Sequence, residues 1–130
     1  MLIAQVKMRA RGVAISILEL DPFFKQLLVY LFAGTRGAEM RVKIVVALND
    51  KPSNINELAK LLGVHYKAMQ YQIDVLYKNK LIQTPQRESC GAVYFLTPVM
   101  ERHLEYIKGI WKRYGRPKLR LSETAYSAVN

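Results

Sequence analysis

The sequence predicts a mainly α-helical fold with one small β-hairpin, an α+β class. In residues 56–76 the small residue Ala59 precedes Gly63 by four positions, as in two helices joined by a tight turn. Two short runs rich in β-forming residues follow, at 81–84 and 92–96, with a polar turn between them. Together these features favour two crossing helices followed by a hairpin.

Composition restricts the partners that the chain could bind. Its 130 residues carry 20 Lys and Arg against 10 Asp and Glu, a formal net charge of +10 with 51% hydrophobic residues. A basic surface favours a polyanion, nucleic acid first and an acidic membrane surface second. The single cysteine, Cys90, allows no intramolecular disulfide, so we expect a reducing, cytoplasmic setting. Neither N-terminal apolar stretch reaches the roughly 20 residues that span a bilayer.

The N-terminal arm is ambiguous up to Asp21. Residues 4–8 and 13–20 fit either strands or helical pieces around Gly12. Asp21 followed by Pro22 predicts a helix start, with Asp as the N-cap and Pro at the first helical position. The helix is expected to end at Gly34 and to bury a broad apolar face.

The next three helices have clear local signals. One is predicted to begin after Gly37 and to end at 49–53, because apolar residues recur at helical spacing between these points. Asn54 followed by Glu57 is a capping-box variant that opens the next helix. After Gly63, which can adopt a positive φ, a further helix is expected from about Tyr66 to Lys78.

A hairpin that directly follows a helix-turn-helix is the wing of a winged-helix domain. Pro98 then opens a last predicted helix, over 98–114, whose apolar residues alternate at four- and three-residue spacing, as in a coiled-coil seam. We therefore divide the chain into an N-terminal arm and helix (1–34), a winged helix-turn-helix domain (35–97), a dimerisation helix (98–116) and a tail (117–130).

A further pattern is carried by residues 33–37, 41–44, 56–59, 66–67, 75–76, 79 and 81–82. With these residues the chain resembles archaeal winged-helix transcriptional regulators of the ArsR-like kind over about residues 31–97. The resemblance implies a homodimeric DNA-binding fold in which the second helix of the motif reads the DNA. Its cap position holds His65, where many relatives have Ser, Thr or Asp, and Tyr71-Gln72 replaces a His pair.

The predicted reading helix offers side chains suited to duplex DNA. Gln70 can pair with adenine, Lys67 can reach guanine or phosphate, and tyrosines can contact phosphate or a thymine methyl group. Asp74 is expected at the groove edge or paired with Lys78. Arg87 at the wing tip is a candidate for phosphate or minor-groove contact. The candidate DNA-binding residues are His65, Tyr66, Lys67, Gln70, Tyr71, Asp74, Arg87, Arg36 and Arg41.

A homodimer is expected because the two flanking helices have broad apolar faces. Two-fold symmetry then predicts a palindromic site with half-sites roughly 34 Å apart. The candidate interface residues are Met100, Leu104, Ile107, Trp111, Tyr114, Phe24 and Leu28.

No catalytic, cofactor or metal-binding arrangement stands out in the sequence, so an enzyme is not expected. Cys90 lacks a cationic cluster that would clearly lower its pKa, and His103 alone cannot build a metal site. Two alternatives to a DNA-binding regulator remain open. One is a winged-helix module that docks a protein of the transcription machinery. The other is a regulator whose residues 13–33 lie on a membrane surface.

Overall fold

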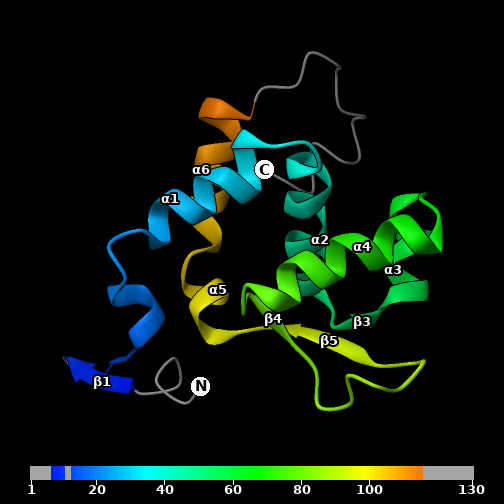
Figure 1. Cartoon of the computed structure of the whole chain (residues 1–130), viewed down its shortest axis with the longest axis horizontal. Coiled ribbons are helices and arrows are strands. Elements are labelled where there is room, and N and C mark those ends of the chain that lie inside the picture. The colour runs from blue at the N-terminus through cyan, green and yellow to red at the C-terminus, as the bar shows by residue number, and fades with distance from the viewer. Residues whose placement is uncertain (1–6, 11–12, 116–130) are drawn as a thin grey trace.

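Short helices lie on one side of a small antiparallel sheet (Figure 1). The computed structural model describes residues 7–10 and 13–115, with side-chain surroundings from Leu18 onward. This confirms the mainly α, α+β class. The elements are β1 (Lys7–Ala10), β2 (Val13–Ser16), η2 (Ile17–Leu20), α1 (Phe24–Val29), η3 (Tyr30–Gly34), α2 (Ala38–Asp50), β3 (Ser53–Asn54), α3 (Ile55–Leu62), α4 (Tyr66–Lys78), β4 (Ile82–Gln83), β5 (Val93–Leu96), α5 (Pro98–Arg102) and α6 (Leu104–Tyr114).

The predicted N-terminal helix has two parts and begins later than expected. Strands β1 and β2 form an antiparallel hairpin, and η2 is a 3₁₀ turn. The carboxylate of Asp21 accepts a hydrogen bond from the backbone N–H of Phe23 at 2.8 Å, so it closes a turn before α1 begins at Phe24. The helix then widens into the π-helix η3, which ends at Gly34 as predicted. A π-helix closes with longer hydrogen-bond loops, which the apolar pattern does not encode.

Helix α2 begins after Gly37 as predicted and forms the centre of the molecule. Gly37 has φ of 91°, a conformation that side-chain-bearing residues rarely adopt. A Cβ atom at this position would lie 2.8 Å from the Gln72 amide nitrogen and 2.9 Å from the Arg41 guanidinium. Glycine is therefore required both by the backbone and by the close approach of α4.

The two helices of the predicted motif are confirmed, together with their local signals. The Asn54 side chain accepts a hydrogen bond from the N–H of Glu57 at 2.8 Å, and Glu57 accepts one from the N–H of Asn54 at 2.9 Å. Gly63 has φ of 69° and ends α3, while the N–H of Val64 donates to the carbonyl of Ala59. The turn of three residues then leads directly into α4.

The predicted hairpin is confirmed, and a third strand joins it. Ile82 pairs with Leu96 and β4 runs antiparallel to β5. On the other edge, Ser53 pairs with Tyr94, giving the order β3-β5-β4. Strand β3 has two residues, too few for an alternating pattern in the sequence. It links the start of α3 to the hairpin, so the sheet holds both ends of the segment that contains α3 and α4.

The predicted single helix over 98–114 is broken at His103. The N–H of His103 donates to the carbonyl of Met100, and its φ of −105° and ψ of 10° depart from helical values. The His103 ring contacts Phe24 edge-on and its Nδ1 lies 2.9 Å from the carbonyl of Val99. Packing against the N-terminal helix thus fixes a bend that the seam spacing does not reveal.

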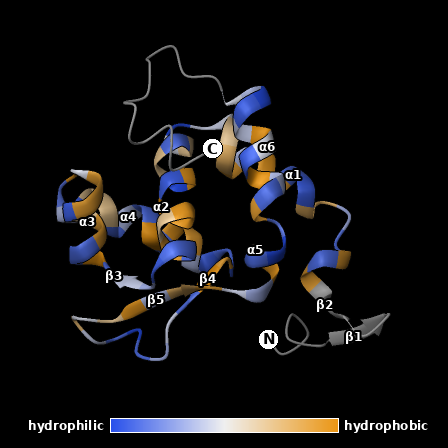
Figure 2. Ribbon diagram, turned by 180° about the vertical axis from the view of Figure 1, so that it is seen from behind, coloured by the Kyte–Doolittle hydropathy of each residue, from blue (hydrophilic) through white to orange (hydrophobic). Residues whose placement is uncertain are grey.

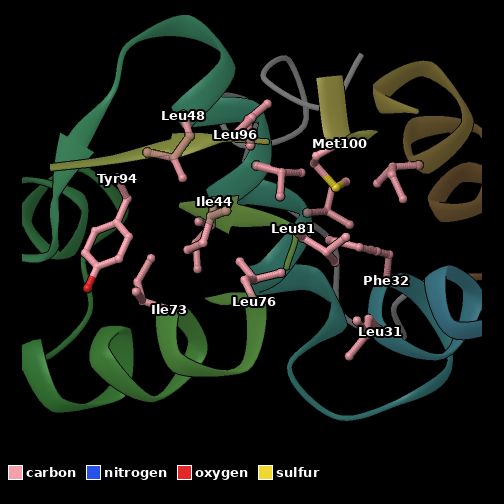
Figure 3. Packing of buried hydrophobic residues seen from close by; sticks show 14 of the residues in the cluster. Leu31, Phe32, Ile44, Leu48, Ile73, Leu76, Leu81, Tyr94, Leu96 and Met100 are labelled. Carbon is pink, nitrogen blue, oxygen red and sulfur yellow. The ribbon is translucent and has the colours of Figure 1, made fainter. Parts of the chain in front are cut away.

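One continuous core includes both flanking helices (Figure 3). Side chains of α2, α4 and β5 meet those of η3 and α5, for example Ile44, Ile73 and Phe32. Figure 2 shows hydrophobic residues on α2, α6 and β5 where these elements meet. The core therefore extends beyond residues 35–97.

The expected dimer interface is largely part of this core. Only Tyr114 among its candidate residues is exposed, at 60%. The other six side chains are at most 7% exposed within a single chain, so they are not available to a second copy in this structure: Met100, Leu104, Ile107, Trp111, Phe24 and Leu28. Our expectation placed them between two chains because the seam spacing marks a buried face without telling which chain covers it.

No helix in the described ranges 7–10 and 13–115 combines the length and the apolar character needed to cross a bilayer. The predicted tail, residues 117–130, lies outside these ranges, as do residues 1–6 and 11–12 of the N-terminal arm.

Candidate nucleic-acid interface

Helix α4 has one face in the core and one face open to solvent. Its buried side is formed by Met69, Ile73 and Leu76, each at 0% exposure. We call four of the exposed positions the outer row of α4. It consists of Tyr66, Lys67, Gln70 and Tyr71.

The outer row has the chemistry of a base-reading and phosphate-contacting surface. Tyr66 and Tyr71 are 41% and 63% exposed. Gln70 presents an amide donor and acceptor, and Lys67 presents a cation on the same side. A helix with such a face fits the width of the DNA major groove. The sequence placed these four residues together, and the structure brings them onto one side of one helix.

The helix start at His65 carries no side-chain cap. Its backbone is extended, with φ of −67° and ψ of 149°, and its imidazole makes no capping hydrogen bond. The side chain is exposed beside Tyr66. First-turn N–H groups of a helix favour anions, so this end of α4 adds to the attraction that Lys67 exerts on phosphate.

Asp74 and Arg87 form an ion pair with each other and do not point freely into solvent. The Arg87 guanidinium donates to Asp74 Oδ1 at 2.8 Å and to the hydroxyl of Tyr94 at 2.9 Å. It also lies over the ring of Tyr77, 4.2 Å from the ring centre. The hydrogen bond to Asp74 is the main reason that the pKa of Arg87 is raised above its usual value. Arg87 is thus held against α4, and the partner of Asp74 is Arg87 and not Lys78.

Sequence reasoning missed Tyr77 and Tyr94 as members of this cluster. Their rings meet edge-on with centres 6.4 Å apart, and Tyr94 is almost completely buried. A buried tyrosine usually finds a partner for its hydroxyl group. The sequence signal was the inward position of Tyr94 in an alternating strand, but the identity of its partner depends on the path of the loop.

Arg41 was expected to contact phosphate, and the structure contradicts this. Its side chain is buried, with 3% exposure for the residue. Nε donates to the carbonyl of Leu31 at 2.7 Å, Nη1 to the Gln72 Oε1 at 2.7 Å and Nη2 to the Thr35 hydroxyl at 2.6 Å. Burial lowers the pKa of Arg41, and the neighbouring tyrosines Tyr71 and Tyr30 act in the opposite direction.

The Arg41 bonds join three separate elements. They connect the carbonyl of the π-helix η3, the turn at Thr35 and the amide of Gln72 on α4. Arg41 therefore orients the helix that carries the outer row instead of contacting a ligand. Arg36, in contrast, is exposed beside this junction and stays available to an anion.

Other charges divide between paired and open positions. Lys43 lies 3.1 Å from Glu39 on the same helix, and Arg102 pairs with Glu19, which raises the pKa of Arg102. Lys112 and Arg113 are exposed on α6. The first cation of the basic C-terminal stretch, Arg102, is thus paired within the chain. The positions of this stretch from 116 on lie outside the described residues.

Among the residues that the structure describes, no three His, Cys, Asp or Glu side chains gather in a group that could hold a metal ion. Cys90 is exposed in the loop between β4 and β5. Comparison of the chain with models of protein families, with curated proteins and with solved structures finds no significant match.

Proposed function

We propose that this chain is a sequence-specific, double-stranded DNA-binding regulator of transcription. In this proposal α3, α4 and the β4–β5 hairpin form a winged helix-turn-helix, α4 enters the major groove, and the hairpin contacts the flanking backbone. The outer row of α4 supports the proposal most directly, since an amide, a cation and two tyrosine rings occupy the exposed face of one helix. The net charge of +10 adds a general attraction to the DNA backbone.

Each member of the outer row has a role under this proposal. Gln70 pairs bidentately with an adenine edge, and Lys67 reaches a guanine or a phosphate. Tyr66 and Tyr71 contact phosphate or thymine methyl groups. Arg36 lies beside the start of α2 and contacts the DNA phosphate backbone next to the major groove.

A homodimer remains part of the proposal, but its interface differs from the one that the apolar spacing of residues 98–114 suggested. Because the seam side chains are buried, a second copy would meet the outer sides of α1 and α6. Aromatic residues stand out there: Phe23 is 64% exposed, Tyr114 is 60% exposed and Tyr106 is 36% exposed. A symmetric pair of such surfaces would place two α4 helices on a palindromic site.

The direct test is selection of bound fragments from random duplex DNA, followed by affinity measurements from about 50 to 200 mM salt. We expect a selected sequence and a linear fall of log affinity with log salt concentration. Lys67→Ala should weaken binding to all duplexes and reduce the salt slope by about one. Lys51→Ala, which changes an exposed lysine at the end of α2, is the matched control and should leave the affinity and the salt slope nearly unchanged.

Two outcomes would reject the DNA proposal. One is the absence of duplex affinity at about 50 mM salt, and the other is an affinity that does not respond to salt. Either result favours the protein-interaction module, whose aromatic surface would act through apolar contact.

A further inference from the structure

The loop between β4 and β5 is not positioned by its strands. We call residues 84–92 the wing loop. Strand β4 has two residues, and only two residue pairs, Ile82 with Leu96 and Gln83 with Phe95, join it to β5. A ladder this short fixes the base of a hairpin but leaves the direction of a nine-residue loop open. Figure 1 shows the loop extending beyond the sheet.

Arg87 supplies the missing connection between the wing loop and α4. It is the point where the loop contacts Asp74 and Tyr77 of the helix and Tyr94 of the strand, through two hydrogen bonds and one ring contact. A guanidinium has a planar fork of donors, so it can serve two acceptors and stack on a ring at the same time. A lysine could not make all three contacts.

The same contact changes the charge on the reading side of α4. Asp74 is four residues after Gln70 and three after Tyr71, so it lies on the same side of the helix as the outer row. An unpaired carboxylate there would repel the DNA backbone. The 2.8 Å ion pair with Arg87 offsets this charge, and it does so with a group that belongs to the wing loop.

We propose that Arg87 is a positioning residue that clamps the wing loop to α4 and neutralises Asp74, so that helix and wing meet the duplex as one rigid unit. The inference rests on the proposed DNA-binding function. It replaces the expectation that Arg87 itself contacts a phosphate or the minor groove. Under this proposal the wing reaches the flanking DNA backbone through exposed uncharged residues such as Gln86 and Ser89, at a distance from the major groove that the clamp sets.

The sharpest test is Asp74→Asn, because the clamp and simple charge arithmetic predict opposite results. Removing an acidic residue from a DNA-facing surface should by itself strengthen binding. Loss of the clamp should instead weaken binding to the selected duplex by about fivefold, the scale of one ion pair. Glu88→Gln removes an equal charge from the exposed wing loop and is the matched control. It should bind no more weakly than the unmodified chain.

Two further variants separate positioning from direct contact. Arg87→Gln should weaken binding at least as much as Asp74→Asn, and Arg87→Lys should restore part of the loss because it keeps the ion pair. Hydrogen exchange of the free protein should accelerate in residues 84–92 in Asp74→Asn and Arg87→Gln, with thermal melting retained. Footprints of both variants should lose protection of the flank while the central protection stays.

The outcomes distinguish a failure of the Arg87 clamp from a failure of the proposed DNA-binding function. If the unmodified chain does not bind duplex DNA, the proposed function fails, although the exchange measurement still tests the clamp in the free protein. If the chain binds DNA and Asp74→Asn binds as tightly as Glu88→Gln, the clamp is wrong and the function stands. Normal exchange in the wing loop of both clamp variants would likewise overturn it.

Discussion

Helices α4 and α6 have similar apolar patterns, but the sequence suggested different partners for their apolar sides. In both, apolar side chains recur on one side, and in both that side is buried against the core of the same chain. For α4 the buried side was expected to face its own core, and it does. For α6 it was expected to face a second chain. Spacing thus identifies which side of a helix is covered but does not identify the chain that covers it.

The outer sides of the two helices also differ. The outer row of α4 combines an amide and a lysine with two tyrosines. On α6 the exposed positions include Tyr106, Gly109, Lys112 and Arg113. Both sides are basic and aromatic, so charge alone does not decide which one meets DNA. The following predictions test the distinction.

The largest effect is expected on the inner side of α6. Trp111→Asp places a carboxylate in the core and should lower the free energy of unfolding by roughly 4 kcal/mol or more. Tyr106→Asp, on the outer side, should change it by less than about 1 kcal/mol. Urea unfolding measures both, and light scattering of Tyr106→Asp tests the outer dimer surface. A stable, folded Trp111→Asp protein would contradict the burial of this side chain.

Next in size is the difference between the two arginines at the start of α2. Arg41→Ala leaves the carbonyl of Leu31 and the amide of Gln72 without their donor, which should cost about 2–4 kcal/mol. Arg36→Ala should cost less than about 0.5 kcal/mol but weaken DNA binding and its salt slope. Chemical denaturation and binding titrations of both variants check this. Equal stability losses would mean that Arg41 does not support α4 as described.

The outer row should affect selectivity more than stability. Gln70→Ala is expected to reduce discrimination at one base pair by roughly 1–3 kcal/mol, the scale of a bidentate base contact. The fold should survive because Gln70 is exposed. Binding to every single-base variant of the selected site measures the effect. Unchanged discrimination would place sequence reading outside this part of α4.

The smallest effects are expected for glycine-to-alanine substitutions at two positions. They should change the free energy of unfolding in opposite directions. Gly63→Ala forces a side chain into φ of 69°, and should destabilise the chain by about 1 kcal/mol. Gly109→Ala in α6 meets open space and should stabilise it by roughly 0.5–1 kcal/mol through helix propensity. Thermal melting compares the two. The same sign for both would show that one of these backbone assignments is wrong.

Local signals predicted much of the fold because the atoms that satisfy them are close in sequence. The capping box between Asn54 and Glu57 spans three residues, and the left-handed turn at Gly63 requires only its own backbone. The π-helix, the two-residue strand β3 and the break at His103 were missed. Each depends on packing between distant segments, which adjusts the backbone by one or two residues.

The candidate site likewise has a part that the sequence predicted and a part that it did not. The exposed outer row of α4 followed from its spacing against Met69 and Ile73. The roles of Arg41 and Arg87 did not, because their partners lie far along the chain: Gln72 is 31 residues from Arg41 and Asp74 is 13 residues from Arg87. In the sequence each was an isolated cation, and isolated cations in a basic chain suggest a polyanion.

The sequence by itself determined α2, α3 and α4 with their start and end points, the hairpin and the side chains on the outer row of α4. These depend on backbone preferences and on periodic burial, both of which are local. Only the tertiary structure decided that the α6 side chains close the chain's own core and that two arginines bind internal acceptors. A buried guanidinium must find acceptors wherever the fold brings them, and the fold brings them from positions that no local pattern connects.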